Sequence, residues 1–328
     1  MKISAAIIGM GIGSKHLQAI EELKNCSVKI ICEKNLKKIN YLRKKFPTKL
    51  ITNDENKIFD NKDINLVSIA SYDNFHYSQI IKSIKSKKHI IIEKPMCLNY
   101  KQLKKIYELL KKNNGIKIYS NLVLRVNKLF NEFKKRILKK NIFYIEADYI
   151  WGRKFKLYGW RAKIRDYSII SGAAIHMIDL CNWILASKPK SIFALGNKKS
   201  TKNTKFKKES FVVLLIKYPN NVIVKITANA SGIYDHFHEL KIFSKDKTLV
   251  NSRLGAFEHN QKLFKKLNFS YPDKANRGKM IQNFIKSLKN KKIKPFLSKK
   301  YQFELMSICF AGQQSLKLSK EIKIKYLK

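Results

Sequence analysis

Short apolar runs alternate with helical segments over the first 120 residues, and this alternation restricts the possible fold more than any other feature. The segments between the runs carry apolar residues three and four positions apart, which is the spacing of one helix face. The expected strands are SAAIIG, VKIIC, NLVSIA, HIII and IKIYS. Such alternation is typical of a doubly wound parallel sheet with right-handed crossovers.

The pattern changes after Arg125. One helical segment, LFNEFKKRILKK, is followed by longer alternating strands, and the turn signal YPNN joins two of them as a hairpin. These strands are FYIEADYIWG, SIFALGN, FVVLLIKYP, NVIVKITANAS and FHELKIFS. We therefore predict an α/β domain at residues 1–122 and a second domain at 123–328. The second has a large open, mostly antiparallel sheet, a helix at GAAIHMIDLCNWIL and a C-terminal helix.

The net charge of +46 raises the question of a nucleic-acid partner. Only eight of the 69 basic residues are arginines, although base and phosphate readers favour the arginine fork. The lysines are spread over helix faces such as KQLKKIYELLKK, so we expect a solvated lysine surface and no nucleic-acid site. The charge also suits the collection of an anionic substrate.

Membrane, metal and redox signals are weak. No run of about 18 apolar residues is present, so we expect no membrane span. The five cysteines are scattered without a CxxC pair, and the histidines lack companions at ligand spacing. We expect a reducing cytoplasm and no metal site.

The stretch IIGMGIGSKHL joins the first strand to the first helix. A glycine-rich turn here lets the backbone approach a pyrophosphate, which the helix N-terminus then stabilises. The usual spacing puts the third glycine at position 14, where this chain has Ser14. The residues expected to bind a dinucleotide here are Gly9, Gly11, Ile12 and Gly13.

Further cofactor contacts are expected at the ends of the second and third strands. Glu33 ends the second strand, where an acid accepts ribose hydroxyls and repels a 2′-phosphate, so NAD is favoured. Lys34 beside it leaves NADP possible. After the third strand, Ser71 and Asn74 are expected near the cofactor, whereas His76 is at least as well explained as a cap or packing residue.

A buried strand, HIII, runs directly into Glu93, Lys94 and Pro95. Proline cannot continue a ladder, so these residues mark the carboxyl end of the strand, the edge at which open parallel sheets bind ligands. A lone lysine at a strand end is usually only solvated. Its companions in the sequence favour a functional role.

Together these motifs, with NLVLR and SGAAIHMIDLCNWIL, resemble the successive signatures of the Gfo/Idh/MocA oxidoreductase family. The resemblance implies a Rossmann domain followed by an open-sheet domain, and NAD(P) chemistry on a carbon of a sugar, cyclitol or sugar nucleotide. It also implies a homo-oligomer, dimer or tetramer, formed through the open sheet face. A sugar nucleotide used in surface-polysaccharide synthesis is the preferred substrate.

The resemblance implies roles for particular residues. Lys94, with a pKa lowered by partial desolvation and the cofactor's charge, would relay a proton during hydride transfer. Glu93 would fix the loop or contact ribose, and a cis Lys94–Pro95 bond is plausible. His176 would be the acid/base nearest the reacting hydroxyl, with Asp179 orienting it or binding substrate. Many members have an aspartate four residues before this histidine, where this chain has Gly172.

The stretch DYIWGRKFKLYGWRAK is rich in aromatic and cationic side chains. It either binds a sugar and its carboxylate or phosphate, or forms an aromatic cluster at a domain interface. Arg125, which matches the family's arginine at the domain junction, either binds substrate or pairs across the interface. The candidate substrate residues are Arg125, Tyr149, Trp151, Arg153, Lys156, Trp160 and Arg161.

An alternative of another class is a non-catalytic NAD(P)-binding regulator on the same fold. The glycine at position 172 favours it, whereas the intact Lys94 and His176 favour an enzyme.

Overall fold

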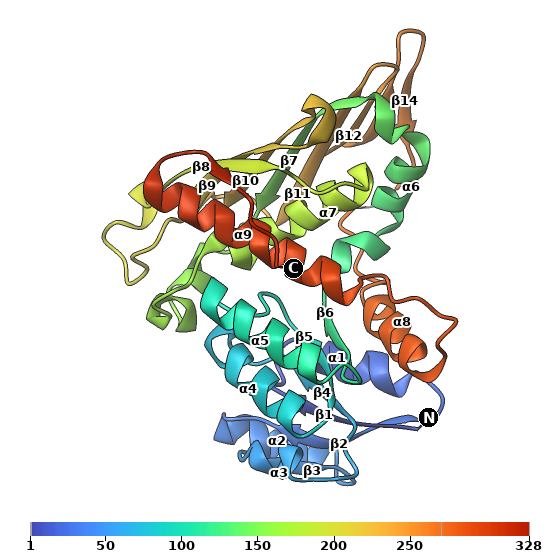
Figure 1. Cartoon of the computed structure of the whole chain (residues 1–328), viewed down its shortest axis with the longest axis vertical. Helices are drawn as coiled ribbons and strands as arrows, with labels where there is room; N and C mark the ends of the chain where they lie inside the picture. Colours follow the sequence, from blue (N-terminus) through green and yellow to red (C-terminus); the bar gives the residue numbers. More distant parts are fainter. Residues whose placement is uncertain (1, 270, 328) are drawn as a thin grey trace. The chain divides into compact units, whose positions relative to one another are not determined.

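The computed structural model describes residues 2–269 and 271–327. The chain forms two compact units (Figure 1). The first combines the residues up to Asn121 with Ala275–Phe303, and the second combines Leu122–Lys274 with the residues from Glu304 onward. None of the helices in the described ranges is both long and apolar enough to cross a bilayer.

The first unit contains a parallel sheet with the strand order β3-β2-β1-β4-β5-β6. The order reverses between β1 and β4, as in a doubly wound fold, so the predicted sheet is confirmed. Its strands are β1 (Ile3–Ile8), β2 (Cys26–Cys32), β3 (Leu50–Thr52), β4 (Leu66–Ile69), β5 (His89–Ile92) and β6 (Ile118–Ser120). The connecting helices are α1 (Gly13–Glu21), α2 (Leu36–Lys45), α3 (Asn56–Phe59), α4 (Asp73–Lys85) and α5 (Tyr100–Lys112).

Helix α8 (Gly278–Lys289) also belongs to the first unit, although the sequence prediction assigned everything after residue 122 to the second domain. Its buried face packs on α1, where a side chain at Gly278 would lie 3.2 Å from the β-carbon of Ala19. Phe284 stacks on Tyr119 of β6 with ring centroids 4.8 Å apart. The amphipathic pattern of α8 indicates a buried face but does not say which surface covers it.

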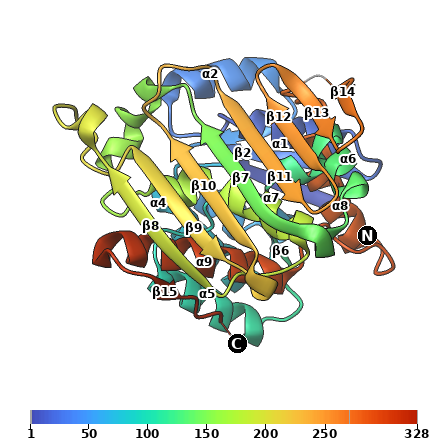
Figure 2. The ribbon, with the colours of Figure 1, turned by 90° about the horizontal axis from the view of Figure 1, so that it is seen from above.

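In the described part of the second unit, nine strands form one sheet (Figure 2). The strand order is β14-β13-β12-β11-β7-β10-β9-β8-β15, and all neighbours are antiparallel except β7 and β10. The predicted mostly antiparallel sheet is therefore confirmed, as is the hairpin between β9 and β10. The strands are β7 (Ile142–Ile150), β8 (Ser191–Asn197), β9 (Phe211–Lys217), β10 (Ile223–Asn229), β11 (Phe237–Ser244), β12 (Thr248–Ser252), β13 (Gly255–His259), β14 (Phe264–Leu267) and β15 (Ile322–Lys323).

Helices cover one face of this sheet (Figures 1 and 2). They are α6 (Lys128–Arg136), α7 (Ile175–Leu185) and the part of α9 (Lys299–Leu318) that belongs to the second unit. A single π-helical turn, Ile170–Ala174, leads directly into α7. The strands alternate buried residues, which face the helices, with more exposed ones, so the opposite face carries exposed apolar residues such as Phe143, Leu195 and Leu215.

Candidate cofactor and substrate sites

The turn between β1 and α1 requires two of its three glycines. Gly9 has a φ of +88°, and a β-carbon there would lie 2.6 Å from the carbonyl oxygen of Ala70. At Gly13 a β-carbon would lie 2.9 Å from a methyl group of Ile7. Gly11 faces open space, with no atom of the described chain within 4 Å of its would-be β-carbon, so its backbone is approachable.

The N-terminus of α1 suits an anion. Ile12, at the N-cap, is exposed and offers no capping side chain, and the first turn contains no acidic residue. The helix dipole and the amides of the first turn therefore favour a phosphate group. These observations fit the pyrophosphate of a dinucleotide.

Glu33 ties the glycine turn to the start of α2. Its Oε2 accepts a hydrogen bond from the Met10 amide at 3.1 Å, and its Oε1 accepts from the amides of Lys34 at 2.9 Å and Asn35 at 3.1 Å. The ammonium of Lys34 donates to the carbonyl of Asn53 at 2.8 Å. Glu33 thus shapes the turn, while its contact with ribose stays a prediction.

The residues after β4 support the loop that carries Lys94. His76, buried in α4, contacts the carbonyl oxygen of Pro95 through Nδ1 at 2.7 Å, and the Lys94–Pro95 bond is cis. The Ser71 hydroxyl donates to Gln79 at 2.7 Å. This geometry fits the packing interpretation of His76, whereas Asn74 lies exposed in the first turn of α4.

Glu93, at the end of β5, is held by two donors that the sequence did not single out. Its Oε1 lies 2.9 Å from Nε2 of His16 and 2.8 Å from Nδ2 of Asn121. Burial acts to raise the pKa of Glu93, but the hydrogen bonds from His16 and Asn121 outweigh it, so the pKa lies below its usual value. Glu93 is therefore a carboxylate.

The contact with Glu93 fixes the orientation of the Asn121 amide. A carboxylate can only accept, so the amide nitrogen must face it, and Oδ1 points elsewhere. That buried oxygen has no donor within the described residues. An acceptor left open at the carboxyl edge of the sheet fits a cofactor that brings hydroxyl or amide donors. Glu93 and Lys94 stand at the same edge, at the end of the neighbouring strand β5.

In the second unit, Asp179 of α7 forms a bidentate ion pair with Arg125. The Arg125 Nε lies 3.0 Å from both carboxylate oxygens, and its second nitrogen lies 2.6 Å from Oδ1. Asp179 is 1% exposed. Both residues belong to the second unit, so this pair lies within one unit, and both interpretations of Arg125, substrate binding and pairing across the interface, stay predictions.

Gly172 lies in the π-helical turn before α7. A β-carbon at this position would lie 2.6 Å from the hydroxyl oxygen of the buried Tyr167. The space next to the absent side chain is therefore filled by Tyr167, a residue that the sequence did not single out.

His176 is buried in α7 and lies parallel to the ring of Tyr149, with ring centroids 5.8 Å apart. Tyr149 also contacts the rings of His236 and His238 edge to face, at 5.4 and 4.8 Å. The register of β7 and β11 places His238 opposite Tyr149. The HFH pattern, with two histidines on one side of a strand, was the available signal for this cluster.

The predicted aromatic and cationic stretch gathers around Arg161. Its guanidinium lies 4.0 Å from the ring centroid of Trp160 and 5.0 Å from that of Trp151. Burial lowers the pKa of Lys156, and the charges of Arg153 and Arg161 lower it further. Within the described residues, these three cations form no ion pair with a carboxylate.

Fold and residues together define a class of protein. The first unit has a dinucleotide-binding turn and a lysine at the end of its fifth strand. The second has a histidine on the helix that covers its sheet. This combination is that of a two-unit, nicotinamide-dependent oxidoreductase.

Comparison with known proteins gives the family. The profile described as "Oxidoreductase family, NAD-binding Rossmann fold" matches residues 3–120, and that of the "GFO/IDH/MocA C-terminal domain" matches 141–250. The chain belongs to the Gfo/Idh/MocA family, as its motifs predict. The predictions of an oxidoreductase and of an NAD-binding Rossmann domain are confirmed.

Several of the similar proteins are cyclitol dehydrogenases by name. "Inositol 2-dehydrogenase" of Salmonella paratyphi B is 22% identical over 241 residues, which cover 72% of this chain and 70% of the relative. Among solved structures, myo-inositol 2-dehydrogenase from Lactobacillus plantarum has a TM-score of 0.83 at 17% identity, covering 99% of this chain and 100% of the other. Scyllo-inositol dehydrogenase from Lactobacillus casei, with bound NAD(H) and scyllo-inositol, has a TM-score of 0.81 at 15% identity, covering 98% and 99%.

Proposed function

We propose that this protein transfers hydride between NAD and a secondary alcohol or keto carbon of a cyclitol, sugar or nucleotide-linked sugar. The names of the relatives support a polyol substrate, and the placement of Lys94 at the carboxyl edge of the sheet is the observation that carries the proposal. The protein would work in the cytoplasm as a homo-oligomer. The open face of its sheet, which carries exposed apolar residues such as Phe143, Leu195 and Leu215, is the surface that supports an association of copies.

Bound NAD would supply the hydride acceptor. In the oxidation direction, Lys94 in its neutral form would take the hydroxyl proton as the carbon–hydrogen bond breaks. His176 is proposed as a further acid/base residue of the reaction. Glu33, Ser71 and Glu93 are proposed as cofactor contacts, and Asp179 would act on the reaction through Arg125 and α7.

The substrate is proposed to carry an anionic group. Arg153, Lys156 and Arg161 concentrate positive charge in one stretch of the second unit, and the lowered pKa of Lys156 reflects their mutual repulsion as well as burial. Binding an anion would relieve that repulsion. A diphosphate-linked sugar used in surface-polysaccharide synthesis meets this requirement, whereas a free inositol does not.

The test begins with the purified protein. It is denatured, and any released nicotinamide cofactor is identified. Wild type, Lys94→Ala and the exposed control Lys104→Ala are then assayed at 340 nm against inositols, free sugars and nucleotide sugars. We expect Lys94→Ala to lower kcat by about 10²–10⁴-fold while cofactor binding persists, and Lys104→Ala to match wild type.

Two results would contradict the proposal. Absence of any affinity for NAD(H) would remove its basis. Tight cofactor binding without turnover of the whole panel would favour the regulatory alternative, in which the fold binds the cofactor and does no chemistry.

A further inference from the structure

Four buried or partly buried polar side chains form a hydrogen-bond network under the carboxyl edge of the first sheet. Nδ1 of His16 lies 2.7 Å from the Ser68 hydroxyl oxygen, and Nε2 lies 2.9 Å from Oε1 of Glu93. Asn121 donates to the same Oε1 at 2.8 Å. His16 lies in α1 and Ser68 in β4, while Glu93 and Asn121 directly follow β5 and β6. Because these four side chains come from separate elements, the hydrogen-bond network is part of the core structure.

The connectivity of serine, histidine and glutamate is that of a hydrolase triad, yet nucleophilic chemistry is excluded here. Ser68 is 0% exposed and lies within a central strand, so no substrate reaches its hydroxyl. His16 is 1% exposed and is equally remote from a substrate. The hydrogen-bond network must therefore act through Glu93, which is its only partly exposed member.

The hydrogen-bond network determines which atoms of His16 and Ser68 donate their protons. Glu93 is a carboxylate and can only accept, so Nε2 of His16 carries a proton and donates it to Oε1. In neutral His16, Nδ1 then accepts from the Ser68 hydroxyl. Both donors to Glu93 reach Oε1, and Oε2 accepts no hydrogen bond from the described residues. One oxygen of the carboxylate is thus held by the core while the other stays open at the ligand-binding edge.

We propose that His16 is a positioning residue for the cofactor. It holds Glu93 charged and oriented so that Oε2 of Glu93 accepts a hydrogen bond from a hydroxyl of the nicotinamide-side ribose. The inference rests on the proposed function, because it takes NAD as the ligand. A charged acceptor makes hydrogen bonds about twice as strong as a neutral one, so the state of Glu93 sets part of the cofactor affinity.

The proposal predicts a pH signature that packing alone would not give. The groups facing Glu93 are His16 from α1, Asn121 directly after β6 and the adjacent Lys94, and all three stabilise its charge. Without His16, burial would raise the pKa of Glu93 towards pH 7. Cofactor affinity would then fall as pH decreases, whereas in wild type it stays level until lower pH.

The experiment measures the Kd of NADH by fluorescence between pH 5.5 and 8.5 for wild type, His16→Leu and His16→Gln. Leucine removes the donor, and glutamine retains an amide donor of similar reach. We expect His16→Leu to weaken binding about tenfold or more at pH 6 and less at pH 8.5. His16→Gln should stay within about threefold of wild type at every pH. The exposed His259→Leu serves as control.

Equal Kd profiles for the three proteins would overturn the proposal, and so would an equal, pH-independent loss in both His16 variants, which would indicate packing alone. If His16→Leu fails to fold, Asn121→Ala removes the second donor, and an unshifted pH profile for it would overturn the proposal. Wild type that binds no NADH would instead contradict the proposed function.

Discussion

The ion pair between Asp179 and Arg125 allows a test of whether Asp179 has a structural or a catalytic role. Removing one partner of a buried pair leaves the other charge uncompensated, which costs about 3–5 kcal/mol. We expect Asp179→Asn to lower the free energy of unfolding by about 3 kcal/mol, measured by denaturant titration. Asp235→Asn, which breaks the exposed contact with Arg253, should cost less than about 1 kcal/mol. Unchanged stability with lost turnover in Asp179→Asn would instead indicate a direct role in catalysis.

Single residues differ in how far the sequence reveals them. Lys94 is predictable because proline and a buried strand fix its place at the sheet edge. His16 was missed, although the sequence carries a signal: it is a polar residue on the inward face of α1, whose other buried members are Gly13, Leu17, Ala19 and Ile20. Its partners are 52 and 77 residues away, and no local pattern identifies partners at that distance.

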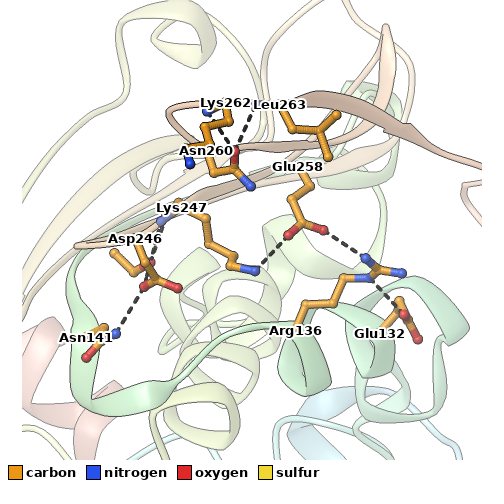
Figure 3. Close-up of polar contacts among 10 residues, drawn as sticks. Glu132, Arg136, Asn141, Asp246, Lys247, Glu258, Asn260, Lys262 and Leu263 are labelled. Carbon is orange, nitrogen blue, oxygen red and sulfur yellow. Dashed lines mark hydrogen bonds and ion pairs between the residues drawn. The ribbon is translucent and has the colours of Figure 1, made fainter.

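At the scale of elements, a charged network joins α6 to the far strands of the second sheet (Figure 3). Glu258 of β13 accepts from Lys247 and from Arg136, each at 2.8 Å, and Arg136 also donates to Glu132 at 2.8 Å. The bond from Lys247 lowers the pKa of Glu258 most, burial opposes it, and the bond from Arg136 adds to the lowering.

This network predicts a pH-dependent stability. Because the folded pKa of Glu258 lies below the unfolded value, its contribution is complete above about pH 5 and is lost as pH falls through the folded pKa. We expect Glu258→Gln to lower stability by about 2 kcal/mol at pH 7. The difference in Tm from wild type should close below about pH 4. A difference that persists at pH 3 would show that packing, not charge, dominates.

The same region shows where sequence prediction of elements stops. All five strands expected in the second unit are present, but β12, β13, β14 and β15 were not predicted. These strands have two to five residues each, and FKKL in β14 has no continuous apolar face. Their pairing is set by neighbouring strands and by contacts such as Glu258 with Arg136, which lie 122 residues apart. Long, strongly patterned segments specify their own structure, whereas short polar strands depend on the sheet around them.

At the scale of the whole molecule, the net charge of +46 acts differently on anionic and on neutral substrates. A positive field raises the local concentration of an anion and leaves a neutral polyol unaffected. Salt shortens the screening length from about 10 Å at 0.1 M to about 3 Å at 1 M. With NAD saturating, we therefore expect the KM of a nucleotide-linked sugar to rise several-fold over this range, and that of an inositol to change by less than about twofold.

Local and global charge can be separated by matched variants. If the cations around Arg161 bind the substrate anion, Arg153→Ala with Lys156→Ala should raise KM and flatten its dependence on salt. The control Lys37→Ala with Lys44→Ala removes the same charge from exposed positions of α2 and should leave both almost unchanged. Equal effects of the two pairs would assign the salt dependence to the overall field. A salt-independent KM for every substrate that turns over would contradict the anionic substrate, and a cyclitol would then be the better assignment.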